Sequence, residues 1–141
     1  MVRSKADFKA LRELCGLTHG DVASALGVRN LSVKRWENPN TEPGWYEPPQ
    51  DAWDYLDEMR ERMEARADLM TLQAIDARDR SGISEVEVPY HRGRGEHNHD
   101  YDGPEPVGFA NAAARLAWLN LESEGFEVRF RFPQNVGQSE N

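Results

Sequence analysis

The sequence predicts a mainly α protein with a small β component: an N-terminal helix-turn-helix bundle, a long connecting helix and a C-terminal β-α-β unit. Three observations predict it. Small and apolar residues within 11–37 have the spacing of two short helices packed across a tight turn. Between Pro49 and Arg80, no glycine or proline interrupts a charged segment. Two segments with the two-residue strand period, 85–90 and 126–132, flank an alanine- and leucine-rich helical segment, 109–124.

Length and composition limit the possibilities further. A chain of 141 residues with 38% hydrophobic residues can form one modest core, or a small domain with an appended unit, which favours a dimer. No apolar run approaches the roughly 20 residues of a membrane span, and the N-terminus is too polar for a signal peptide. The single cysteine, Cys15, is compatible with a reducing compartment. We therefore expect a cytoplasmic protein without membrane contact.

The net charge of −8 is unevenly distributed. Residues 1–40 hold seven Lys and Arg against four Asp and Glu, a net charge of +3, whereas residues 41–80 sum to −6 and residues 81–141 to −5. A phosphate backbone responds to the field within a Debye length of roughly 8 to 10 Å. The acidic remainder therefore does not exclude nucleic-acid binding by the first 40 residues.

Capping residues predict where the first helices begin. Two pairs, Ser4 with Asp7 and Thr18 with Asp21, have capping-box spacing and predict helices that end at the glycines in positions 16 and 27. Asn30 is the nearest capping candidate for a third helix, which runs to about residue 37 before the proline at position 39.

Five residues predict how the second and third helices pack. A steep crossing needs a small residue at the contact, Ala23, and a turn residue free to take positive φ, Gly27. The apolar residues Val28, Val33 and Trp36 anchor the third helix to the core. This arrangement is typical of a helix-turn-helix that docks on DNA.

Helical geometry then turns a polar row outward: Asn30, Leu31, Lys34 and Arg35. Asparagine can pair with adenine, lysine or arginine with guanine, and leucine can touch a thymine methyl group. His19 and Ser32 are candidates for phosphate contacts, and Thr18 caps a helix whose N-terminal amides can also face phosphate. The candidate DNA-binding residues are Thr18, His19, Arg29, Asn30, Leu31, Ser32, Lys34 and Arg35.

Residues 5–40 resemble the Cro/repressor-type, XRE-like helix-turn-helix regulators through the pattern LxxxxGLTxxDVAxxLGVxxxSVxRWE. The order of elements that follows is similar to that of phage anti-CRISPR-associated repressors and their bacterial relatives. The resemblance implies a homodimer, built by residues 83–132, that represses its own operon from an inverted repeat, with Asn30, Leu31, Lys34 and Arg35 contacting the bases. Arg29 departs from the pattern, since this class usually has a small capping residue there.

The rest of the chain predicts a connecting helix and an association unit. An apolar stripe interrupted at Arg66 fits a helix that lies on its own domain, and equally one that pairs with a symmetry mate: Ala52, Leu56, Met59, Met63 and Met70. In 126–132, phenylalanines and Val128 alternate with charges, and Pro89 marks 85–90 as an edge strand. Because the chain offers one other good strand, we expect 126–132 to pair across a dimer interface. The predicted domains are 1–80, a dimerisation unit 81–132, and a disordered tail 133–141.

Other functions were weighed against this one. The loop histidines lie near three acids but lack the spacing of a structural zinc site or a nuclease, so we expect no metal, no cofactor and no enzymatic activity: His91, His97 and His99 with Glu96, Asp100 and Asp102. Trp45 and Tyr46, in a proline-rich linker, are expected to close the core. The alternatives are an antitoxin whose acidic half binds a basic toxin, and a protein-interaction module that has lost DNA binding.

Overall fold

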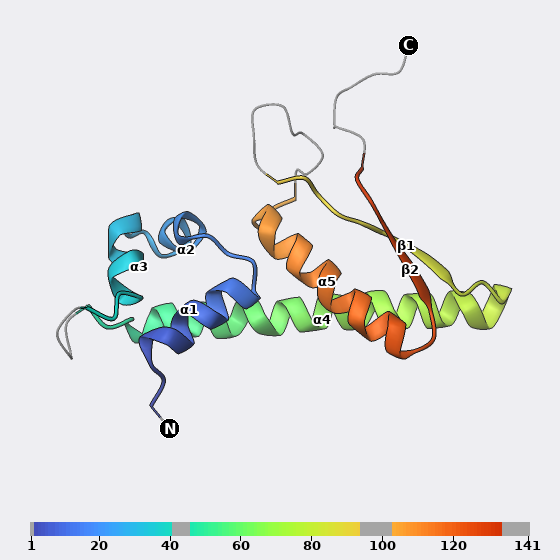
Figure 1. The fold of residues 1–141 in the computed structure, drawn as a ribbon, viewed down its shortest axis with the longest axis horizontal. Helices are drawn as coiled ribbons and strands as arrows, with labels where there is room; N and C mark the ends of the chain where they lie inside the picture. Colours follow the sequence, from blue (N-terminus) through green and yellow to red (C-terminus); the bar gives the residue numbers. More distant parts are fainter. Residues whose placement is uncertain (1, 41–45, 94–102, 134–141) are drawn as a thin grey trace, which may run out of the picture. The chain divides into compact units, whose positions relative to one another are not determined.

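The computed structural model describes residues 2–40, 46–93 and 103–133, which form two compact units, Met1–Glu61 and Arg62–Asn141 (Figure 1). Within these residues the protein is mainly helical with one two-stranded parallel sheet, which confirms the predicted fold class at that level. The elements are α1 (Lys5–Leu14), α2 (His19–Leu26), α3 (Asn30–Trp36), α4 (Gln50–Ser81), β1 (Glu85–Pro89), α5 (Val107–Ser123) and β2 (Glu127–Arg131).

Reciprocal hydrogen bonds fix the starts of α1 and α2. The Ser4 hydroxyl accepts from the Asp7 amide at 3.1 Å, and the Ser4 amide donates to the Asp7 carboxylate at 2.7 Å. Thr18 and Asp21 repeat this pair of bonds at 3.0 and 2.9 Å. Both capping boxes are confirmed, and each satisfies amides that the first turn of a helix otherwise leaves without acceptors.

The start of α3 differs from the prediction. Arg29, with extended backbone, occupies the N-cap, and its side chain makes no capping hydrogen bond. Asn30 is the first helical residue, so the expectation that it caps α3 is wrong. Its side chain instead lies beside Gly20, where a methyl group would be 3.6 Å from Asn30 Nδ2. The first turn of α3 therefore lies against the first turn of α2.

An aromatic cluster centres the core of the first unit. The Phe8 ring meets Trp36 of α3 edge-on at 5.9 Å between centroids, and Trp53 of α4 at 5.1 Å. Val22 and Val33 are completely buried beside them. Aromatic pairs in this geometry contribute about 0.5–1.5 kcal/mol beyond their buried area. They tie α1, α3 and the start of α4 into one body.

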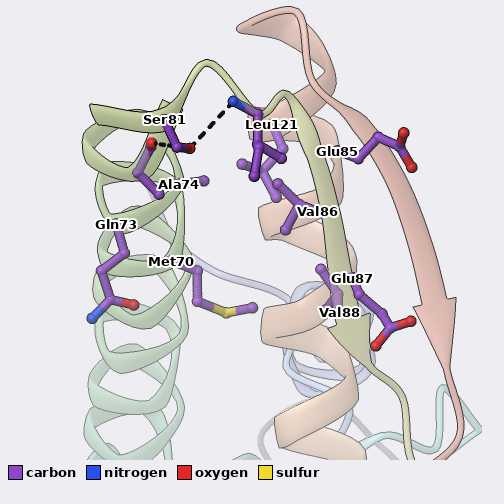
Figure 2. A pocket seen from close by; sticks show the side chains of 11 residues that line it. Met70, Gln73, Ala74, Ser81, Glu85, Val86, Glu87, Val88 and Leu121 are labelled. Atoms are coloured by element: carbon purple, nitrogen blue, oxygen red, sulfur yellow. Dashed lines mark hydrogen bonds between the residues drawn. The ribbon is translucent and has the colours of Figure 1, made fainter. Parts of the chain in front are cut away.

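The second unit packs a small sheet on two helices. β1 and β2 run parallel, with Val86 beside Val128 and Val88 beside Phe130, and α5 lies between them in the chain. Val86 and Val88 point toward the helices, whereas the acidic residues of β1 point away (Figure 2). The core consists of Ala67, Val88, Ala114, Ala117, Leu121 and Phe126. Its many alanines let helix backbones approach closely.

Two expectations about the C-terminal part need correction. The boundary between the units lies at Glu61, inside α4, and not after residue 80. The reason is that the second half of α4 contributes Ala67 to the core of the second unit, with Met70 and Ala74 packed against it. β2 also pairs with β1 of the same chain, because α5 supplies the crossover that parallel strands require.

Candidate nucleic-acid interface

A tight turn sets the geometry of α2 and α3. Gly27 has φ 69° and ψ 32°, the left-handed conformation in which a side chain is strained, and its amide donates to the Ala23 carbonyl. The Val28 amide donates to the same carbonyl at 3.0 Å. Ala23 is buried. The small residue and the turn glycine therefore act as the sequence predicted.

Val28 does not have its expected role as a core anchor. Its side chain is 37% exposed, although its backbone is held by the turn. Only Val33 and Trp36 of the three predicted anchors are buried. Their spacing of three places them on one side of α3, and Val28 lies before the helix begins, so the helical period does not apply to it.

The opposite side of α3 presents four residues to solvent: Arg29, Asn30, Leu31 and Lys34. Leu31 is 47% exposed. Neither Arg29 nor Lys34 forms an ion pair with any residue that the structure describes. Two cations, an amide and an apolar side chain thus share one accessible face. This chemistry suits phosphates and base edges.

Arg35 is held differently from its neighbours. It is half-buried, and its guanidinium lies over the Tyr46 ring at 4.7 Å from the centroid. Its carbonyl accepts a hydrogen bond from Lys5 Nζ at 2.9 Å. Arg35 lies next to Trp36 at the border of the buried face, which explains why it does not project fully as predicted. Tyr46 is 44% exposed and so does not close the core, and Trp45 lies outside the described residues.

A charged network joins α1 to the end of α3. The Glu37 carboxylate accepts hydrogen bonds from Arg12 Nε at 2.6 Å and Nη2 at 2.9 Å, and His19 Nε2 lies 3.0 Å from Glu37 Oε1. Arg12 Nη1 also donates to the Leu17 carbonyl at 2.8 Å. The side chains of Arg12 and Glu37 are 8% and 6% exposed.

This environment shifts the titration of Glu37. Burial by itself raises the pKa of a carboxyl group, but the hydrogen bonds and charges of Arg12 and His19 outweigh it and hold the pKa of Glu37 below its ordinary value. Glu37 is therefore ionised at neutral pH. The network also changes the expectation for His19, since one ring nitrogen faces Glu37 and a phosphate could use only Nδ1.

The sequence analysis missed Arg12 and Glu37. Arg12 follows Phe8 by four residues and precedes Cys15 by three, so it lies on the apolar side of α1. A charged residue on that side is the signal that could have indicated a buried ion pair, because an unpaired buried charge is too costly.

The remaining predicted contacts are less exposed. The Thr18 hydroxyl is used by the capping box, and Ser32 is half-buried in the first turn of α3. Both lie near the exposed row only through their backbones. Thr18 is 3.7 Å from a methyl group placed on Gly20, so Thr18, Gly20 and Asn30 meet where α2 and α3 begin.

The described part of the chain shows no other constellation with catalytic chemistry. A groove of about 420 Å³ between α4 and β1 has a mostly apolar lining that includes Met70, Val86 and Leu121 (Figure 2). No cluster of three metal-ligand side chains occurs among the described residues. Five of the loop residues considered above, His97 and His99 with Glu96, Asp100 and Asp102, lie outside them.

His91 is described, and its backbone is held by α5. The Asn111 side chain accepts from the His91 amide and donates to the His91 carbonyl, both at 2.9 Å. No described helix is both long and apolar enough to cross a membrane. Comparison of the chain with protein-family models and with curated proteins found no match.

Proposed function

We propose that this protein is a homodimeric, sequence-specific DNA-binding transcriptional regulator of the Cro/repressor helix-turn-helix type, which acts in the cytoplasm as a repressor on an inverted repeat. In this proposal α2 and α3 form the helix-turn-helix, and the β1-α5-β2 segment forms the dimer. Two copies of α3 then enter major grooves about one helical turn apart, roughly 34 Å.

One observation carries the proposal: the exposed row Arg29, Asn30, Leu31 and Lys34 stands on a helix whose other side is anchored by Val33 and Trp36. A rigid helix with polar groups at fixed spacing can match the donors and acceptors of base edges. The exposed cations of α3 attract phosphates, and their local field acts within a Debye length.

The capping boxes, the Gly27 turn and the Arg12–Glu37 pair all support the same reading, because they fix α3 without using its exposed side chains. Asn30 and Lys34 are the proposed base contacts. Arg29, at the N-cap outside the helix, is the proposed phosphate contact. Arg35 can join them only by leaving the Tyr46 ring.

Selection of bound fragments from random DNA tests the proposal. We expect an inverted repeat, and we expect Lys34→Ala to weaken binding to it by at least about tenfold, since a lost base contact costs about 1–3 kcal/mol. Lys9→Ala is the matched control: it removes the same exposed charge from α1, away from the proposed row.

Equal affinities of the folded Lys34→Ala and Lys9→Ala variants would contradict the assignment of α3. A selection that recovers no common sequence would contradict sequence-specific binding altogether. The solution mass of the DNA-bound protein, two chains per inverted repeat, tests the dimer separately.

A further inference from the structure

The two edges of the small sheet differ, and β2 has the open one. The Glu127 amide donates to the Ser84 carbonyl, and the Arg131 carbonyl accepts from the Tyr90 amide, both at 2.9 Å. Backbone groups alternate sides along a strand, so those of Val128 and Phe130 point away from β1. The sheet formed by the described residues has two strands, and none of them lies on that side.

The corresponding edge of β1 is protected. Its outward backbone groups belong to Glu85, Glu87 and Pro89, and proline has no amide hydrogen to donate. α4 runs beside this edge, with the groove between them (Figure 2). Charged residues, proline and a covering helix are the usual means by which proteins prevent pairing at an edge.

Apolar surface accompanies the open edge of β2. Phe130 is 37% exposed and Phe132, just beyond the strand, is 63% exposed. Trp118 of α5 meets the Phe130 ring edge-on at 5.3 Å and is itself exposed. The edge with available hydrogen bonds is therefore also the edge where aromatic side chains contact water.

We propose that β2 pairs antiparallel with β2 of a second copy of this chain, centred on Arg129, to give a continuous four-stranded sheet. The inference rests on the proposed function, because it supplies the contact that holds the homodimer. Val128 then exchanges two hydrogen bonds with Phe130 of the second copy. Glu127 lies opposite Arg131 of the second copy, twice in the symmetric pair.

Charge and hydrogen bonding favour this register. Centring on Phe130 would place Arg129 opposite Arg131, and like charges directly opposite destabilise a ladder. Centring on Val128 would require the Phe126 amide, which already donates to Leu121. With Arg129 on the axis, each guanidinium keeps carboxylates of its own chain nearby, Glu85 at 3.8 Å and Glu127 at 3.9 Å. β1 paired with itself about Glu87 would bring two glutamates together.

Proline substitutions test which edge associates. We expect sedimentation equilibrium of the full chain to show a dimer, and Val128→Pro to weaken dimerisation by at least about thirtyfold, because it removes an edge donor and its hydrogen bond on each side of the axis. Glu85→Pro is the matched control, since the Glu85 amide faces the other edge. Far-UV circular dichroism checks that both variants are folded.

A charge exchange tests the register. Glu127→Arg and Arg131→Glu each create two like-charge pairs in their own homodimer, whereas a mixed dimer of the two variants has two opposite-charge pairs. We expect native mass spectrometry of the mixture to show a heterodimer-to-homodimer ratio at least about fivefold above the statistical value. Contacts within each chain cancel, since both species contain the same two chains.

A monomeric wild type, a Val128→Pro variant that dimerises as well as Glu85→Pro, or a statistical ratio in the mixture would overturn the inference. Persistence of the dimer in Val128→Pro would direct attention to the exposed leucines of α4, Leu69 and Leu72. If Val128→Pro unfolds, the charge exchange decides, because it changes only exposed side chains. These readouts use no DNA, so they are separate from failure of the proposed DNA contacts.

Discussion

The Glu37 carboxylate accepts two hydrogen bonds from the Arg12 guanidinium, at 2.6 and 2.9 Å, and so joins the end of α3 to α1. Both side chains are almost fully buried. Because the pair is bidentate and His19 adds a third contact at 3.0 Å, it fixes the rotation of α3 about its axis. That rotation determines which side chains of α3 face outward.

Breaking this pair should cost far more than breaking a surface pair. We expect Glu37→Ala to lower the free energy of unfolding by about 3–5 kcal/mol, because it leaves the Arg12 charge buried without its partner. Asp57→Ala removes the exposed ion pair with Arg3, and we expect a loss of about 0–1 kcal/mol. Urea unfolding measures both. Equal losses would show that Arg12 finds water when Glu37 is removed.

The same carboxylate predicts a pH dependence. The pKa of Glu37 is lowered on folding, so its contribution to stability is complete above the ordinary value of 4.5 and is lost as the pH falls through the lower folded value. We expect the unfolding free energy of the wild type to fall more steeply below about pH 4.5 than that of Glu37→Gln. Urea titrations between about pH 3 and 6 measure the two slopes. Parallel slopes would contradict the assignment.

The two glycines of α2 should respond oppositely to alanine. Gly27→Ala places a side chain at φ 69°, and we expect a loss of about 1–2 kcal/mol. Gly20 lies in the helix, where a methyl group meets neighbours at ordinary distances, and we expect Gly20→Ala to stabilise the protein by about 0.4–1 kcal/mol. Thermal unfolding compares them. A stable Gly27→Ala variant would mean that the turn can be made another way.

Salt dependence should separate phosphate contacts from base contacts. We expect Arg29→Ala to reduce the slope of log affinity against log salt by about 1, and to weaken all DNA sequences alike. Asn30→Ala should leave the slope unchanged and lower discrimination at one base pair of each half-site. Fluorescence anisotropy at several salt concentrations provides the slopes. Reversed behaviour of the two variants would exchange their roles.

Local features could be predicted from the sequence because their causes lie within a few residues. The capping boxes at Ser4 and Thr18 depend on a residue three positions later, and the turn depends on the freedom of Gly27 itself. The helical period correctly placed Val33 and Trp36 inside and Lys34 outside. It failed for Val28, which precedes the helix, and for Arg35, which found the Tyr46 ring eleven residues away.

By itself, the sequence determined the mainly helical class, the helix starts and the polar row on α3. The tertiary structure decided the pairing of Arg12 with Glu37, the pairing of β1 with β2 inside one chain, and the division of α4 between two units. The physical reason is the range of the interactions. Caps and turns are satisfied within one helical turn, whereas a buried charge and a strand edge are satisfied by groups that only folding brings near.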